Sequence, residues 1–312
     1  MIAAKDAADV LGAALSALAG QSLAPWEVVV VDDGSQDNTA SVAEAWRDRL
    51  PVKVLRLPRS GGPGRARHLG VERTSAPLVS FLDADDVVLP SHLADLCAVH
   101  AERGGIVSPD GLFWFPGRGV DTSRYRDERP VAAPHGQIRE ILRHNFLTIA
   151  SLVGRDDYDA VGGFRGDFDG AEDWDLWMRL IRSGVHVHGT GASYVYRQSL
   201  GSCSRESRAA AASLSLIDAV LPELDGDERV VALRTRRAWR GKLVTARALE
   251  HARQGRWAAA RRTAVPAVAC RDRSSVRAAA IVVSPRRAAV LAELRAQRLW
   301  GVSVQKDAGT RA

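Results

Sequence analysis

Apolar and polar positions near the start of the chain alternate between helical and strand spacing. Between Val10 and Leu18, apolar side chains recur every three or four positions, which predicts a helix with one buried face. The run over residues 27–32 is β-branched without alternation, which is typical of a strand buried on both faces. Further strands are expected over residues 52–57, 78–83, 185–188 and 192–197, further helices up to residue 49 and over 65–73, 91–99, 136–143 and 172–182, and a loop over 117–134.

Strands that alternate with helices predict an α/β fold, a mostly parallel sheet flanked by helices with right-handed crossovers. Ligands of such sheets bind beyond the carboxyl ends of the strands. Two expected strands end in acidic residues, one at Asp32 and Asp33 and the other at Asp83, Asp85 and Asp86. We therefore expect both acidic clusters to open into the same crevice.

The pattern changes to continuous helix after about residue 205, and the charge changes with it. Residues 1–228 hold 23 Lys and Arg against 33 Asp and Glu, whereas residues 229–312 hold 20 against 4. We therefore predict one α/β domain over residues 1–205 and a basic α-helical extension over residues 206–312. The extension is either a solvated helical cap or a surface that contacts an anionic membrane. Nucleic acid is not expected as a partner, because no aromatic platform or binding module accompanies the charge.

Composition narrows the cellular setting. The three cysteines, Cys97, Cys203 and Cys270, are widely spaced and form no C-x-x-C pair, which argues against a disulfide framework or a structural zinc site. No apolar run is long enough to cross a bilayer, and the N-terminus lacks the features of a secretory signal. The expected location is the cytoplasm, with peripheral attachment to the inner face of the membrane as the alternative.

Candidate chemistry is concentrated in Asp83-Ala-Asp85-Asp86. Alternate residues of a strand share a face, so Asp83 and Asp85 are expected to point the same way. Carboxylate oxygens at a strand end suit Mg²⁺ or Mn²⁺, which would act as a Lewis acid on a departing diphosphate. The structural alternative is a solvated acidic turn that caps the next helix.

Two loops could contact a nucleotide. The glycine-rich segment over residues 60–68 matches neither the dinucleotide fingerprint nor the phosphate loop with Gly-Lys-Ser/Thr. Its glycines, Gly62 among them, would let the backbone approach a ligand, and Arg65 or Arg67 could pair with phosphate. Asp33, in the Val31–Ser35 turn, is either a ligand for the base or ribose of a nucleotide or an ordinary turn residue.

A third candidate is the start of the helix over residues 172–182, where Glu172, Asp173 and Trp174 stand in a row. Acidic residues in a first turn are favoured by the helix dipole, which is a sufficient structural explanation. The functional interpretation makes Asp173 a general base and places Glu172 and Trp174 on the acceptor side. Trp174 either stacks on a sugar or packs in the core.

These segments occur in an order that resembles glycosyltransferase family 2, the inverting transferases with the GT-A fold. The similar segments run from Lys5 to about Ser204 and read VVVDDGS, GGPGRARHLG, FLDADDVVLP, VGGF and AEDWDLWMRL. The resemblance implies that Asp83 and Asp85 bind a metal and the donor diphosphate, that Asp33 contacts the nucleotide base and that Asp173 is the catalytic base. It also implies inverting transfer of a sugar from a nucleotide-sugar donor to a glycan or lipid-linked acceptor, in cell-surface polysaccharide or glycolipid assembly.

The chain departs from the family pattern in two places. Family members open with a strand followed by Pro-x-Tyr-Asn, whereas Ala3, Lys5 and Asp6 stand here at the Pro, Tyr and Asn positions. Either the start codon is misplaced or the nucleotide pocket is altered. Ser199 stands where many relatives carry a histidine that helps bind the metal or product. Both departures favour an alternative, a degenerate relative that binds nucleotide or glycan without turnover, and a weaker alternative is a basic scaffold that acts through its tail.

Overall fold

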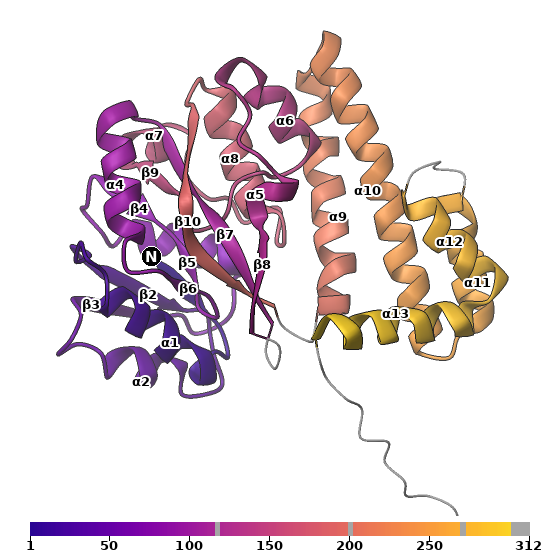
Figure 1. Cartoon of the computed structure of the whole chain (residues 1–312), viewed down its shortest axis with the longest axis horizontal. Coiled ribbons are helices and arrows are strands. Elements are labelled where there is room, and N and C mark those ends of the chain that lie inside the picture. Colours follow the sequence, from indigo (N-terminus) through magenta and orange to yellow (C-terminus); the bar gives the residue numbers. More distant parts are fainter. Residues whose placement is uncertain (116–118, 199–201, 269–272, 301–312) are drawn as a thin grey trace, which may run out of the picture.

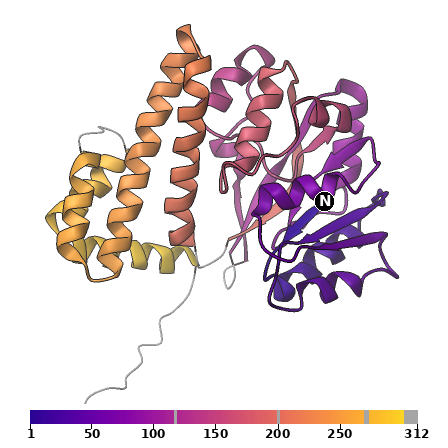
Figure 2. The ribbon, with the colours of Figure 1, turned by 180° about the vertical axis from the view of Figure 1, so that it is seen from behind.

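A computed structural model describes residues 1–115, 119–198, 202–268 and 273–300. An α/β part lies beside a helical part, and the chain passes once from the first to the second (Figure 1). The same division is visible from behind (Figure 2), where the long helices α9 (Ser202–Val220) and α10 (Gly226–Arg253) form the side of the helical part that faces the sheets. Ser199 lies outside the described residues.

The first sheet is fully parallel, in the order β3-β2-β1-β5. Every residue of β2 is buried, as the β-branched run predicts. The helices that follow β1, β2 and β3 connect its strands, so the expected α/β architecture is confirmed. The elements are β1 (Ile2–Ala4), α1 (Ala8–Ala19), β2 (Val28–Asp32), α2 (Thr39–Glu44), β3 (Val52–Arg56), α3 (Pro63–Val71) and β5 (Leu82–Asp83).

The second sheet is mixed, in the order β4-β9-β7-β10-β6, with β8 paired to β7. Only β7 and β10 pair in parallel within it. Helices α4, α6 and α8 lie in the same half of the α/β part (Figure 1). Its elements are β4 (Leu78–Ser80), β6 (Val87–Val88), α4 (His92–Arg103), β7 (Ile106–Phe115), β8 (Gly119–Arg124), α5 (Tyr125–Glu128), a 3₁₀ turn (Pro134–Gly136), α6 (Gln137–Arg143), β9 (Leu152–Gly154), α7 (Arg155–Ala160), α8 (Glu172–Arg182) and β10 (Val187–Arg197).

The loop predicted over residues 117–134 is wrong for residues 119–128, which form β8 and α5. The strand β8 lies at the edge of the sheet and pairs with β7 alone. Its side chains can therefore stay polar, and its sequence shows no alternation of apolar and polar residues. The strand β7 was missed as well, since Pro109 and Gly111 inside it are turn formers. The two strands expected over residues 185–197 form the single strand β10, whose register shifts between Gly189 and Tyr194.

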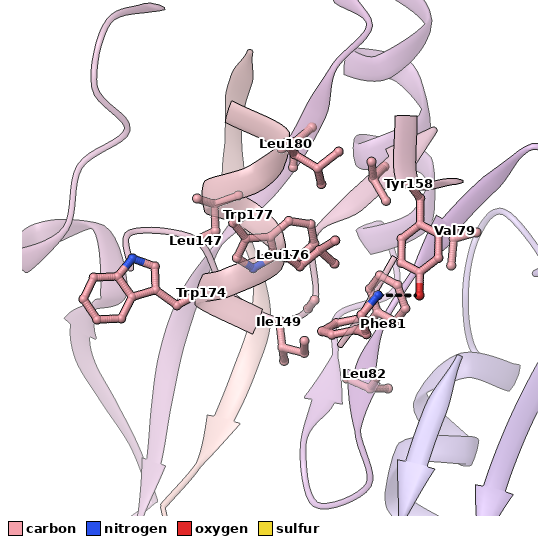
Figure 3. Packing of buried hydrophobic residues seen from close by; sticks show 14 of the residues in the cluster. Val79, Phe81, Leu82, Leu147, Ile149, Tyr158, Trp174, Leu176, Trp177 and Leu180 are labelled. Carbon is pink, nitrogen blue, oxygen red and sulfur yellow. Dashed lines mark hydrogen bonds between the residues drawn. The ribbon is translucent and has the colours of Figure 1, made fainter. Parts of the chain in front are cut away.

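Helix α8 is held by large apolar side chains on its inner face. Trp177 and Leu180 are fully buried, and the Phe81 ring lies edge-on to the Trp177 ring with centroids 6.4 Å apart. Trp174 points to the other side of the helix, away from Phe81 and Tyr158 (Figure 3). This packing fixes where the acidic first turn of α8 lies.

The main hydrophobic core does not end at residue 205. It continues into α9 (Ser202–Val220), a 3₁₀ turn (Leu221–Glu223) and the first part of α10 (Gly226–Arg253), through Leu216, Ile217, Leu221, Leu224, Val231 and Ala232. A separate, alanine-rich cluster joins the end of α10 to α11 (Trp257–Val268), α12 (Arg273–Val283) and α13 (Pro285–Trp300). By packing, α9 and the start of α10 belong with the sheets.

The short strand β1 lies between β2 and β5 at the centre of the first sheet. The amino group of Met1 donates to the Ser80 carbonyl at 2.9 Å, and burial lowers its pKa to about 5. Beside Met1 is a largely apolar cavity of about 540 Å³, lined by residues that include Val28, Trp26 and Leu78 and by none of the predicted site residues. No described helix is both long and apolar enough to span a bilayer.

Candidate active site

The turn after β2 and the glycine-rich loop are bound to each other through Asp33. Its carboxylate accepts hydrogen bonds from the Ser60 hydroxyl at 2.6 Å and from the backbone N–H groups of Gly61 and Gly62 at 2.7 and 3.0 Å. Gly34 has a φ of 71°, and a Cβ there would lie 2.7 Å from the Ser60 nitrogen, so only glycine lets the two loops approach this closely. Asp33 therefore shapes the glycine-rich loop, and a nucleotide base would have to share this carboxylate.

Asp6 ties the segment after β1 to the same turn. Its backbone N–H donates to the Ser35 hydroxyl, and its carboxylate accepts from the Gln36 N–H, both at 2.9 Å. Asp6 also has a φ of 47°, a left-handed conformation that Asn and Asp tolerate better than most residues. The position at which the resemblance expects Asn is thus filled by a residue that tolerates the left-handed conformation found here.

The three carboxylates after β5 lie close together. Asp83, Asp85 and Asp86 each place an oxygen within 4.8 Å of the others. Asp83 and Asp85 keep part of their surface exposed, whereas Asp86 is buried. Carboxylate oxygens at this spacing suit Mg²⁺ or Mn²⁺, so the residues present fit a divalent metal.

The Asp86 carboxylate is hydrogen-bonded to other residues of the chain. Its carboxylate accepts from the Tyr194 hydroxyl and, at 2.7 Å, from the Arg197 backbone N–H. Burial, followed by the charge of Asp83, raises the pKa of Asp86 well above its usual value. Asp86 therefore anchors the end of β10 to the acidic cluster, and Asp83 and Asp85 remain as the accessible candidates for metal binding. Sequence spacing does not reveal this role, since its partners lie more than 100 positions away.

Arg67 joins the acidic cluster to α8. Its guanidinium is buried and donates to Asp83 at 2.6 Å and to Glu172 at 2.7 Å. The predicted pairing of Arg67 with phosphate would require it to leave or share these partners. In this structure it holds the carboxyl end of β5 and the first turn of α8 together, so the metal-binding and base candidates lie on elements that one buried guanidinium joins.

Asp173 lies partly exposed in the first turn of α8. Loss of hydration, followed by the negative charge of Glu172, raises the pKa of Asp173 to about 7. The Arg67 charge opposes this shift, and the Asp83 charge adds to it. A carboxyl group with a pKa near neutrality can take up a proton under physiological conditions, which is what a general base must do.

Asn145 is a neighbour of Asp173 that the sequence did not single out. Its side-chain amide donates to an oxygen of Asp173 at 2.8 Å, while its own carbonyl oxygen accepts from the Leu147 N–H at 3.1 Å. The second contact fixes the amide orientation, so the N–H group faces Asp173. The Asn145 backbone carbonyl is in turn bound by the Tyr125 hydroxyl and by Arg129. Asn145 lies in an irregular segment, where no periodicity marks it.

The two residues predicted on the acceptor side are both buried. Glu172 binds Arg67 and accepts from the Gly170 N–H at 2.8 Å. The Trp174 indole donates to the Ile141 carbonyl at 2.7 Å, and its ring lies against Trp239 of α10 with centroids 5.8 Å apart. Stacking of Trp174 on a sugar would require it to leave this packing.

Known proteins are similar to this chain in sequence. The succinoglycan biosynthesis protein ExoU of Rhizobium meliloti is 31% identical over 214 residues, which are 63% of this chain and 61% of ExoU. The poly(ribitol-phosphate) beta-N-acetylglucosaminyltransferase TarS of Staphylococcus aureus is 36% identical over 106 residues, or 34% of this chain and 18% of TarS. The chain thus spans less than two thirds of the length of these relatives.

Solved structures agree in fold. TarS residues 1–349 in complex with UDP-GlcNAc superpose with a TM-score of 0.60 at 18% identity, covering 94% of this chain and 90% of that one. The mannosyltransferase PcManGT of Pyrobaculum calidifontis, in complex with GDP-Man and Mn²⁺, superposes with a TM-score of 0.59 at 20% identity, covering 97% and 86%. The GT-A fold expected from the resemblance is confirmed.

The decisive comparison covers the candidate site itself. The sequence profile described as glycosyl transferase family 2 matches residues 1–179, more than half of the chain. That range contains the turn of Asp33, the glycine-rich loop, the acidic cluster and the first turn of α8 with Asp173. The chain belongs to glycosyltransferase family 2.

Proposed function

We propose that this protein transfers a sugar from a nucleotide-sugar donor to an acceptor hydroxyl with inversion at the anomeric carbon. The observation that carries the proposal is the bridge that Arg67 makes between Asp83 and the first turn of α8, which carries Asp173. Arg67 links Asp83 to Glu172, the neighbour of Asp173, and Asp83 is close enough to raise the pKa of Asp173. A site for the departing diphosphate and a base for the incoming hydroxyl are what a single displacement requires.

In the proposed reaction, Asp173 accepts the proton of the acceptor hydroxyl as that oxygen attacks the anomeric carbon. Asn145 holds the Asp173 carboxylate in place through its amide. Asp83 and Asp85 would hold Mg²⁺ or Mn²⁺, which supplies charge to stabilise the leaving nucleoside diphosphate. The glycine-rich loop, with Gly62 at its centre and Asp33 behind it, forms the wall on which the nucleotide is placed.

The substrate class is proposed from the relatives. ExoU is named for succinoglycan biosynthesis and TarS for transfer of N-acetylglucosamine to poly(ribitol-phosphate). Structural neighbours were solved with UDP-GlcNAc and with GDP-Man. We infer a glycan or lipid-linked acceptor in cell-surface polysaccharide or glycolipid assembly, and action in the cytoplasm, peripherally at the inner face of the membrane.

The substitution Asp173→Asn tests the base. It should abolish transfer and leave donor binding nearly intact, because the amide keeps the shape and loses the basic oxygen. Folding raises the pKa of Asp173 above that of the unfolded chain, so the charged form, which dominates above about pH 7, disfavours the fold. The variant should therefore not melt earlier at pH 8.

The exposed Asp156→Asn variant, which changes the same charge on α7, is the control and should transfer normally. Transfer retained by Asp173→Asn would remove Asp173 from the base role. Donor binding by the wild-type protein without transfer to any acceptor tested would favour the degenerate relative.

A further inference from the structure

The outer face of α13 combines two charged and two aliphatic side chains. Arg286, Arg287, Val290 and Leu291 are all exposed, with Val290 at 50% and Leu291 at 63%. The two pairs lie one helical turn apart, so they share one side of the helix. We call these four residues the α13 face. The opposite side of the helix packs through Ala288 and Ala289 into the alanine-rich cluster.

This face joins positive charge to exposed apolar surface. Val283, at the end of the preceding helix α12, is a further exposed aliphatic residue at 77%. Within the described part of the chain, neither Arg286 nor Arg287 forms an ion pair with a carboxylate. The region around it carries 20 basic and 4 acidic residues over 229–312. An excess of positive charge beside exposed aliphatic groups suits a surface that is both anionic and apolar.

We propose that the α13 face binds the surface of an anionic lipid bilayer. Arginine side chains reach phosphate headgroups, while Val290 and Leu291 enter the boundary with the acyl chains. A nucleic acid offers phosphate but little apolar surface for the aliphatic pair. A second copy meeting this face across a two-fold axis would bring the arginines of both copies together, and like charges repel.

The position of the face agrees with the proposed use of the crevice. Helix α13 packs beside Ala248 and Ala252, at the end of α10. Because α10 folds back along α9, that end and the start of α9 point to the same side of the molecule (Figures 1 and 2). The start of α9 follows β10, whose last residue, Arg197, donates to Asp86 of the acidic cluster. A bilayer under α13 would thus lie on the side of the molecule where β10 leaves the active site.

This proposal rests on the proposed function in one respect: binding to the bilayer would bring the active site close to a lipid-linked acceptor. The binding test needs no donor, metal or acceptor. If the protein does not bind vesicles, the prediction of nucleotide binding still stands. If the protein does not bind a nucleotide, the result of the vesicle experiment is unaffected.

Co-sedimentation of the full chain with vesicles tests the proposal. Vesicles of equal parts phosphatidylcholine and phosphatidylglycerol should bind the protein at low ionic strength and release it as salt screens the charges. Vesicles of phosphatidylcholine alone should bind it weakly. The double variant Arg286→Ala/Arg287→Ala should lower partitioning about 25-fold, and Val290→Ser/Leu291→Ser at least about tenfold.

The matched control is Arg47→Ala/Arg49→Ala, which removes the same charge from an exposed turn beside α2. It should partition as the wild type does. Absence of wild-type binding, equal binding by the α13 variants, or an equal loss in the control would each overturn the proposal. So would a dimer, seen by sedimentation velocity without vesicles, that dissociates in the α13 variants.

Discussion

Replacing Asn145 by leucine removes the hydrogen bond that its amide donates to the proposed base, and also the bond from the Leu147 N–H, while the number and branching of the side-chain heavy atoms stay the same. The bond joins the Asn145 amide to Asp173 at 2.8 Å. A hydrogen bond to a charged group contributes about 1.5–3 kcal/mol, and about 1.4 kcal/mol corresponds to one pKa unit. Because the amide favours the ionised carboxylate, its loss should raise the pKa of Asp173 from about 7 to between about 8 and 9.

The assay is the release of nucleoside diphosphate during transfer, measured from pH 5.5 to 9.5. The ionised form is the active base, so activity rises with pH through the pKa of Asp173. At pH 7 the ionised fraction should fall from about one half to between about one tenth and one hundredth in Asn145→Leu, and activity should recover at high pH.

The control for this experiment is Tyr125→Phe. It removes the hydroxyl bonded to the Asn145 and Leu147 carbonyls and keeps the amide bond to Asp173, so its pH profile should stay in place. A uniform loss of activity at every pH in Asn145→Leu would refute the reasoning, since it would mean that the amide does not set the ionisation of Asp173.

Two further predictions concern stability. Arg67→Met should lower the free energy of unfolding, measured in urea, by about 3–5 kcal/mol, because Asp83 and Glu172 lose their shared buried partner. The control Arg65→Met, at an exposed position, should change the free energy of unfolding little. Equal effects of the two substitutions would contradict the bridging role of Arg67. A chain cut after residue 205 should fail to fold cooperatively by circular dichroism, because the five large side chains Leu216, Ile217, Leu221, Leu224 and Val231 together contribute roughly 8 kcal/mol or more, comparable to a whole domain's stability. A chain cut after Arg253 keeps this core and should melt cooperatively; a cooperative fold in the shorter chain would restore the boundary at residue 205.

Local pattern was sufficient for β2, β3 and α1, but it did not predict β1, and the single strand expected over residues 78–83 is divided between β4 and β5 of different sheets. The strands β2 and β3 and the helix α1 are regular, and their apolar spacing is the direct consequence of burial on one or both faces. The acidic residues at the ends of β2 and β5 also follow from topology, since parallel strands present their carboxyl ends at one edge.

Contacts between residues far apart in the sequence could not be predicted from local pattern. The role of Asp86 depends on Tyr194 and Arg197, and that of Arg67 on Glu172, all brought together only by the assembled fold. Trp174 illustrates the ambiguity of a single aromatic residue, because sugar stacking and core packing require the same side chain. Its Trp239 partner lies in α10, beyond the predicted domain boundary.

The central claim is that the crevice binds a nucleotide through a metal held by Asp83 and Asp85. Calorimetric titration of the purified chain with UDP, GDP and dTDP, each with and without Mn²⁺, tests it most directly. The account predicts that one nucleotide binds in a Mn²⁺-dependent manner and that Asp85→Ala removes this dependence. Absence of binding by the folded wild-type protein, or Mn²⁺-dependent binding that survives in Asp85→Ala, would contradict it.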